Sequence, residues 1–164
     1  KTYFKQGQKL GVNIKYLEEK KSLGTIGSIS LMENKNKLPF IVCNGDVVSK
    51  VNAENILKFH NLHKSYATIG VVEYEEQNPF GVIKSKNFKF QGISEKPIKK
   101  YFVGAGIYVF NPSISKYLKK NSKLDTPELL NILKKKKKKV LVFPIHEDWK
   151  DIGNLNDLKS KVKN

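Results

Sequence analysis

Short apolar runs alternate along this chain with segments that have the periodicity of helices, and this alternation limits the fold more than any other feature. Such a pattern is typical of a sheet covered by crossover helices. Several neighbouring strand candidates have no helix between them, which indicates some antiparallel pairing. We therefore expect a three-layer α/β domain with a mixed, mostly parallel sheet. The expected strands are 12–17, 40–43, 67–72, 81–84, 88–93, 101–110 and 140–145.

Helix signals stand between these strands. Asn52 is a candidate N-cap for a helix whose apolar face recurs at i, i+3, i+4 and i+7. Another helix is expected from Asp125, a capping residue that is followed closely by Pro127. Further helices are expected at 25–32, from Pro112 and at 155–162.

The charge of the chain comes from lysine alone. The net charge is +16, yet the sequence contains no arginine, the residue whose rigid fork reads nucleic-acid bases. The lysines are scattered, so we expect a solvated surface and no nucleic-acid partner. The one run, 134–139, could bind a polyanion, but its place at the end of a helical pattern also suits the negative end of a helix dipole.

Length and composition predict one domain, 1–164, since 164 residues with 39% hydrophobic content support a single core. No apolar stretch approaches the roughly 20 residues of a membrane helix, and we expect no signal peptide, since the sequence contains no pattern of that kind. The single cysteine, Cys43, excludes an internal disulfide framework. We expect a cytoplasmic protein without a membrane partner. The first residue is Lys1 rather than methionine, which indicates a fragment or a processed chain.

The first candidate for chemistry is Asp46, which follows the apolar run 40–43. Ligands of open α/β sheets collect beyond the carboxyl ends of strands, where a carboxylate can hold a hard cation. The alternative is a hairpin turn at Asn44-Gly45. The apolar run after Asp46 is short and is followed by a capped helix, which disfavours the hairpin.

A second carboxylate, Asp151, lies after another predicted strand, between Trp149 and Ile152. An acidic group among apolar neighbours is costly to desolvate unless it meets a cation. Alternatively it caps the last helix. Taken together, Asp46 and Asp151 are typical of a Mg²⁺ site, because magnesium takes one or two carboxylates and completes its shell with phosphates and water.

Phosphate needs a positive partner, and the segment "ISEKP" offers Lys96, which Pro97 fixes at a strand end. Lys96 could contact a phosphate while Glu95 accepts hydrogen bonds from hydroxyls. A surface ion pair is the ordinary alternative. Gly24 and Gly27, around Thr25, open a predicted helix whose backbone N–H groups could meet an anion or the edge of a base. Three glycines in predicted strands would allow close approach of a ligand, or merely form a bulge; they are Gly81, Gly104 and Gly106.

The order of these motifs is more specific than any one of them. "LGTIGS", "NGDVV", "FGVI", "SEKP", "VGAGIYVFNP" and "DWKDIGN" together resemble the sugar-phosphate nucleotidyltransferase family, and the closest likeness is to its mannose-1-phosphate guanylyltransferase-like and glucosamine-phosphate branch. The resemblance implies a Rossmann-like fold and transfer of a nucleotidyl group from a nucleoside triphosphate to a sugar 1-phosphate for surface glycans.

The resemblance also implies a role for each motif. Asp46 and Asp151 would bind Mg²⁺, Glu95 the sugar and Lys96 its phosphate, so that Asp46, Lys96 and Asp151 would be the catalytic set. The loop containing Gly24, Thr25 and Gly27 would contact the nucleobase. The wall of the sugar pocket would be formed by Gly81, Gly104 and Gly106.

Two departures from the family pattern bear on activity. Many relatives carry Asn or Thr where this chain has Gly104, which removes a contact to the sugar. The first strand and the arginine-containing, glycine-rich loop that grips the triphosphate have no counterpart here. We therefore expect the sugar-facing part of a catalytic domain, inactive alone, that could form a homo-oligomer. A nucleotide-sugar glycosyltransferase, which would usually show an Asp-x-Asp pair, and a non-catalytic sugar-phosphate-binding regulatory subunit are the alternatives.

Overall fold

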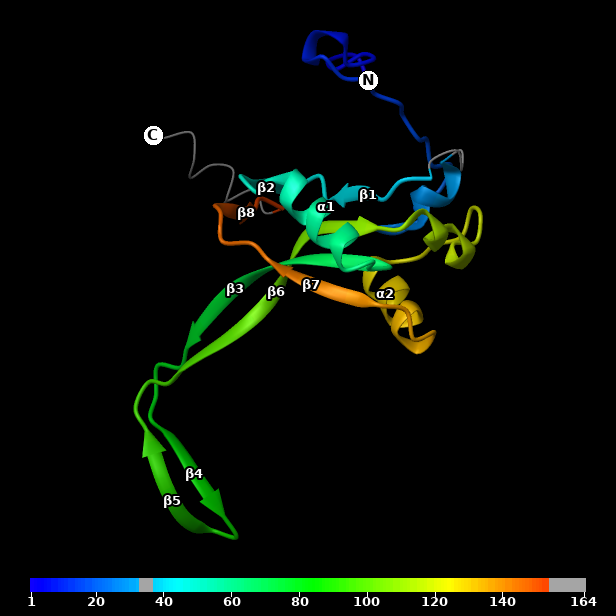
Figure 1. The fold of residues 1–164 in the computed structure, drawn as a ribbon. Coiled ribbons are helices and arrows are strands. Elements are labelled where there is room, and N and C mark those ends of the chain that lie inside the picture. Colours follow the sequence, from blue (N-terminus) through cyan, green and yellow to red (C-terminus); the bar gives the residue numbers. More distant parts are fainter. Residues whose placement is uncertain (33–36, 154–164) are drawn as a thin grey trace.

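The computed structural model describes residues 1–32 and 37–153. Its central sheet has the strand order β1 (Phe40–Cys43), β6 (Ile98–Phe110), β3 (Ala67–Gln77) and β7 (Val140–Pro144). β6 is antiparallel to β1 and β3, whereas β7 is parallel to β3 (Figure 1). The sheet is mixed, as predicted. Three strands share one direction and β6 opposes them, so "mostly parallel" holds for strand direction although only the β3–β7 pairing is parallel.

The remaining elements are short. They are, in chain order, the 3-10 helices η1 (Gln8–Leu10) and η2 (Gly27–Leu31), strand β2 (Val47–Ser49), helix α1 (Ala53–Leu62), strands β4 (Val82–Lys86) and β5 (Lys89–Ser94), the 3-10 helix η3 (Pro112–Tyr117), helix α2 (Thr126–Lys135) and strand β8 (Trp149–Asp151).

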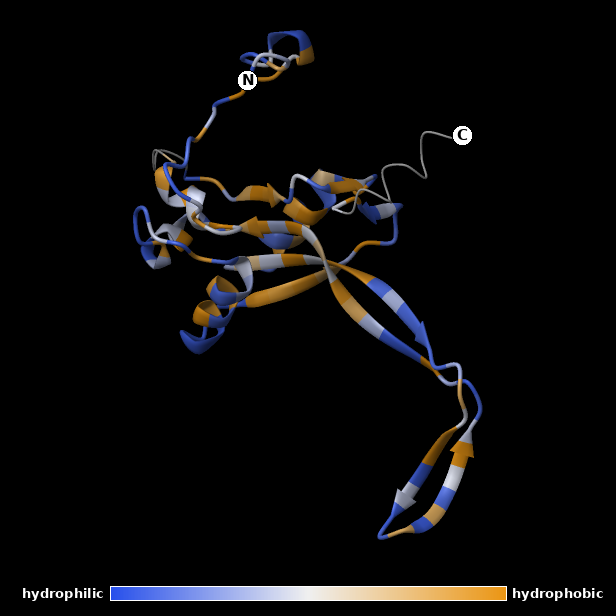
Figure 2. Ribbon diagram, turned by 180° about the vertical axis from the view of Figure 1, so that it is seen from behind, coloured by the Kyte–Doolittle hydropathy of each residue, from blue (hydrophilic) through white to orange (hydrophobic). Residues whose placement is uncertain are grey.

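Both faces of the sheet are covered, which gives the expected three layers. Along β6, Ile107 and Val109 belong to one apolar cluster, while Tyr108 and Phe110 belong to the other, because alternate residues of a strand point to opposite faces. α1 packs into the first cluster through Ile56, and α2 covers the second with two fully buried leucines. The orange strands at the centre of Figure 2 mark this core.

Both α-helices start where the sequence predicts. The Asn52 side chain accepts a hydrogen bond of 2.9 Å from the Glu54 amide at the start of α1. α2 begins with a capping box formed by Asp125 and Glu128. Among residues 1–32 and 37–153, none of the helices combines the length and apolar character of a membrane-spanning segment.

A long ribbon extends from the sheet. Beyond β1 and β7, only residues 72–77 of β3 and 98–103 of β6 remain paired, and the β4–β5 hairpin follows them (Figure 1). The hairpin carries exposed apolar side chains, among them Phe88 and Phe90. Because a two-stranded ribbon has one layer only, these side chains have no core to enter.

Three expected elements differ from the structure, and a fourth is not tested by it. Residues 12–17 form no strand, because no described strand lies beside them to supply hydrogen-bond partners. The helices expected at 25–32 and from Pro112 are the short 3-10 helices η2 and η3. The helix expected at 155–162 lies outside the described residues.

Candidate active site

Asp46 and Asp151 lie side by side. Asp46 precedes β2, Asp151 ends β8, and the two strands pair so that Val47 is opposite Asp151. The Ile152 amide donates to the Asp46 carbonyl at 2.9 Å. A Cβ built on Gly153 would lie 3.2 Å from Oδ2 of Asp46 and 3.1 Å from Oδ1 of Asp151. One oxygen of each carboxylate therefore lies close to the same point. The structure thus brings the two carboxylates together, while the metal ion that they would share stays a prediction. β2 forms no hairpin with β1.

Gly106 lets β6 pass close to the loop that carries Asp46. Its φ is +68°, and a Cβ there would lie 2.8 Å from Cγ2 of Val47 and 3.0 Å from Nδ2 of Asn44. The Asn44 amide donates to the Gly106 carbonyl at 2.8 Å. A Cβ on Gly104 would meet nothing within 4 Å. Close approach therefore explains Gly106, whereas nothing in the described structure crowds Gly104.

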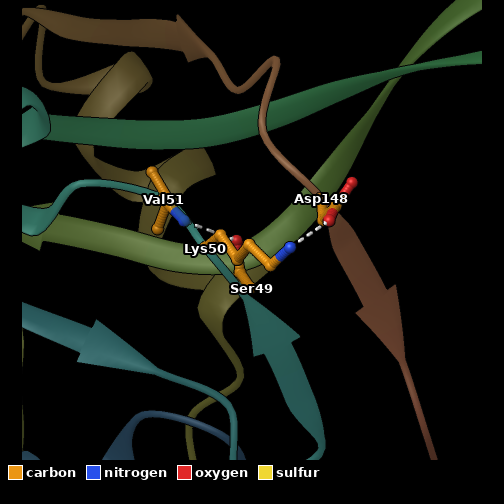
Figure 3. Close-up of polar contacts among 4 residues, drawn as sticks. All are labelled: Ser49, Lys50, Val51 and Asp148. Carbon is orange, nitrogen blue, oxygen red and sulfur yellow. Dashed lines mark hydrogen bonds and ion pairs between the residues drawn. The ribbon is translucent and has the colours of Figure 1, made fainter.

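An ion pair joins the far ends of β2 and β8. Lys50 Nζ donates to Asp148 Oδ2 at 2.7 Å, and the Lys50 amide donates to the Asp148 carbonyl at 2.9 Å. Figure 3 shows this pair beside the hydrogen bond from the Val51 amide to Ser49 Oγ. The hydrogen bond and the charge of Lys50 lower the pKa of Asp148, and the same contacts raise the pKa of Lys50. Both side chains are exposed, so the pair contributes little stability.

An apolar hollow of about 220 Å³ is lined by residues of β1, β2, β6 and α1, and includes Val47, the residue after Asp46. Its lining includes Ile41, Cys43 and Val47 from the sheet side and Ile56 from α1. Burial, and after it the negative charge of Asp46, raises the pKa of the Cys43 thiol. The thiol is therefore mainly protonated at neutral pH and is a poor nucleophile or metal ligand.

The loop of Gly24, Thr25 and Gly27 is occupied by structural contacts. The Thr25 amide donates to Asp125 Oδ1 at 2.9 Å, and Thr25 Oγ1 accepts from the Thr126 amide at 2.8 Å. A Cβ on Gly24 would lie 2.6 Å from the same Asp125 oxygen. This loop packs on the start of α2 and lies near the beginning of β1, whereas Asp46 lies beyond its end (Figure 1). The structure does not bring it to the carboxylate pair.

Glu95 and Lys96 are also apart from the pair. They lie at the base of the β4–β5 hairpin, where a Cβ on Gly81 would be 2.7 Å from Glu95 Oε1 (Figure 1). Ten residues of nearly extended chain separate Lys96 from Gly106, or roughly 30 Å at the rise of a strand. A lysine side chain cannot span this, so the expected contact between Lys96 and a phosphate at Asp46 is not present in this arrangement.

The donor set fits Mg²⁺. Two exposed carboxylates at a strand end are the protein share that magnesium ordinarily takes. In the part of the chain that the structure describes, His, Cys, Asp and Glu form no group of three or more that could hold a metal ion. A closed, all-protein metal cage therefore does not exist among these residues, and an ion here would need substrate phosphates and water as further ligands.

Sequence reasoning missed two contacts that join the segments around the pair. The indole Nε1 of Trp149 donates to the Ala105 carbonyl at 2.8 Å, and Lys50 pairs with Asp148 although 98 positions separate them. The position of Trp149, two residues before a candidate metal ligand, was the only local signal. Nothing local indicates the partner of Lys50.

The fold and this site together define a class of protein: an α/β domain in which two acidic side chains converge at strand ends. The chain belongs to the nucleotidyl transferase family, whose model matches residues 1–163. It is 33% identical over 160 residues to a mannose-1-phosphate guanyltransferase of Pichia angusta, covering 92% of this chain and 43% of that protein. A mannose-1-phosphate guanyltransferase of Yarrowia lipolytica is 32% identical over 168 residues, with 97% and 46% covered. The chain thus spans less than half the length of these relatives.

Solved structures support the fold. A Bacillus anthracis protein assigned as a glucose-1-phosphate thymidylyltransferase, in complex with a sucrose, matches with a TM-score of 0.72 at 22% identity, over 97% of this chain and 68% of that one. HddC from Yersinia pseudotuberculosis matches with a TM-score of 0.68 at 21% identity, over 97% and 70%. At this identity the likeness concerns the fold alone, and it agrees with the fold class expected from the sequence.

Proposed function

We propose that this chain is the sugar-facing part of a sugar-1-phosphate nucleotidyltransferase. The observation that carries the proposal is the convergence of Asp46 and Asp151 around one point. The names of the relatives, mannose-1-phosphate guanyltransferases, favour mannose 1-phosphate and GTP as the first substrate pair to test. Among the solved structures, one of HddC is in complex with GMP-PN.

The proposed reaction forms one phosphorus–oxygen bond and breaks another. An oxygen of the sugar 1-phosphate attacks the α-phosphorus of the triphosphate. The bond from this phosphorus to the bridging oxygen breaks, and pyrophosphate leaves with the electron pair. Asp46 and Asp151 would hold Mg²⁺, which supplies charge neutralisation and alignment of the phosphates when bound. The chain contributes no covalent intermediate, so its residues act by positioning and charge.

The roles of the remaining site residues are also proposals. Lys96 and Glu95 would contact the sugar phosphate only if the ribbon or the substrate bridges the distance to the carboxylates. The contact of Gly24, Thr25 and Gly27 with a nucleobase likewise stays a prediction. The chain contains no arginine to grip a triphosphate, so we expect weak nucleotide binding and slow or undetectable turnover by these 164 residues alone.

Two measurements test the proposal. Mn²⁺ binding to the 164-residue chain, followed by electron paramagnetic resonance, should weaken at least about tenfold in Asp46→Asn and in Asp151→Asn, because each loses a charged ligand. The matched control is Glu147→Gln, an exposed carboxylate that contacts the His146 amide and should leave affinity unchanged. Pyrophosphate release from GTP and mannose 1-phosphate is then measured for the longest polypeptide that can be produced with residues 1–164 as part of it. Unchanged Mn²⁺ affinity in both aspartate variants, or Mg²⁺-dependent release that survives Asp46→Asn, would contradict the proposal.

A further inference from the structure

Strand β8 is too short to hold Asp151 in place by its ladder alone. β2 and β8 contribute three residues each and form a separate two-stranded sheet. A pair of this size is marginal in water without further packing. The position of Asp151 beside Asp46 must therefore depend on contacts outside the ladder.

Trp149 makes the most buried of these contacts. Its side chain is partly buried and packs against the cluster of Ile56, Ala105 and Ile107. Asp151 is two residues further along, on the same side of the strand, since side chains alternate with a period of two. An anchored indole thus fixes the face of β8 from which the carboxylate projects.

The hydrogen bond of Trp149 meets a carbonyl at the irregular part of the sheet. The pairing of β3 with β6 passes from Ile69 opposite Tyr108 to Val71 opposite Gly104, and the pairing of β1 with β6 ends at Ile107. Ala105 falls inside this irregularity and is fully buried. Trp149 Nε1 donates to its carbonyl at 2.8 Å. Because losing a hydrogen bond to a buried carbonyl is costly, this bond ties β8 to the segment of β6 that passes Asp46.

The exposed ion pair between Lys50 and Asp148 holds β8 in place less strongly than Trp149 does. The side chains of Lys50 and Asp148 are 79% and 75% exposed, and pairs of this kind contribute little in water. The ion pair therefore provides a comparison from the same two strands: a contact that also links β2 to β8 but is open to solvent (Figure 3).

We propose that Trp149 is a positioning residue that holds Asp151 in register with Asp46 through its indole N–H and the Ala105 carbonyl. The inference rests on the proposed function, since it assigns a role toward the metal that the two carboxylates would share. Trp149 acts on the ion through Asp151 and does not itself contact the ion. Groups that orient metal ligands in this way typically change metal affinity by about 10 to 100-fold when they are lost.

The test compares Mn²⁺ affinity of four forms of the 164-residue chain: the unaltered chain, Trp149→Phe, Asp151→Asn and the double variant. Trp149→Phe keeps an aromatic ring but lacks the N–H, and we expect about tenfold weaker binding. In the Asp151→Asn background the same change should have no further effect, because the ligand that Trp149 orients is already gone. Lys50→Gln is the matched control and should stay within about twofold.

A second variant covers the case in which Trp149→Phe disturbs folding. Trp149 is the only tryptophan, so benzothienylalanine supplied in its place alters this site alone and replaces the N–H by sulfur in a ring of nearly the same shape. Circular dichroism reports folding of each form. Affinity within twofold of the unaltered chain in the folded analogue, or an equal loss with and without Asp151, would overturn the positioning role. If Asp46→Asn and Asp151→Asn themselves leave Mn²⁺ affinity unchanged, the metal assignment fails instead.

Discussion

The end of the sheet around Asp46 and the distal ribbon are built from the same kind of strand but are held in different ways. Around Asp46, segments far apart in the sequence meet through backbone hydrogen bonds, a partly buried indole and a glycine with positive φ. Along residues 72–77 and 98–103, one strand faces one strand. Close packing on several sides restricts the positions of side chains, whereas a ribbon fixes only its own register.

The two regions also differ in how exposed their polar and charged side chains are. On the ribbon, Lys100 contacts both Glu73 and Glu75 at 2.9 and 2.7 Å, but all three side chains are more than half exposed. In the body, His60 is 1% exposed and its Nδ1 lies 2.9 Å from Thr68 Oγ1. A polar group in the body is therefore sensitive to its partners, while those of the ribbon exchange protein contacts for water at little cost.

The largest expected effect comes from Gly106, where the body is tightest. Gly106→Ala forces a Cβ to within 2.8 Å of Val47 at a φ of +68°, and we expect a loss of about 2 kcal/mol or more in the free energy of unfolding. The matched control is Gly104→Ala, two residues along the same strand, where a Cβ meets nothing within 4 Å. Urea unfolding of both variants measures the difference. Equal costs at the two positions would show that the close approach of β6 to the Asp46 loop is not tight.

The sequence indicated elements of the fold that depend on neighbours along the chain. The bounds of 40–43, the Asn52 cap and the start of α2 at Asp125 all follow from local chemistry, and the structure has them. Residues 12–17 have strand-like composition, but a strand requires a partner, and composition does not supply one. Local patterns therefore predict an element well only where the fold provides its surroundings.

The candidate site divides in the same way. Asp46 and Asp151 each follow a predicted strand, and strand ends on one side of a sheet meet, so their convergence could be predicted. The pairing of β2 with β8 could not be, because three-residue strands carry too little pattern to specify a partner. Lys96 was expected beside the pair because a phosphate needs a positive partner and because the order of motifs resembles the family. Order along the chain does not encode how far β3 and β6 extend beyond the sheet, and this extension separates Lys96 from Asp46.

A smaller effect on stability, limited to acidic pH, is expected from the buried His60. Burial lowers the pKa of its imidazole below the ordinary 6.5, and its Nε2 has no hydrogen-bond partner among the described residues. The folded state then resists protonation while the unfolded state accepts it, so stability is present above pH 6.5 and is lost as the pH falls below this value. Urea unfolding at pH 7.5 and 5.5 should show a loss that is reduced in His60→Gln, whose amide can still bond to Thr68. The same pH dependence in both forms would assign the loss to other groups.

The smallest effect is expected on the hairpin. Phe90 is 67% exposed, so Phe90→Ser removes little buried apolar surface and should change the free energy of unfolding by no more than about 0.5 kcal/mol. The control is Phe110→Ser, at a fully buried position of the sheet core, where we expect about 3 kcal/mol or more. Thermal unfolding of the two variants measures both. A large destabilisation by Phe90→Ser would mean that the hairpin packs against something in solution, because a side chain contributes to stability in proportion to the surface that it buries. That result would remove the distinction between ribbon and body.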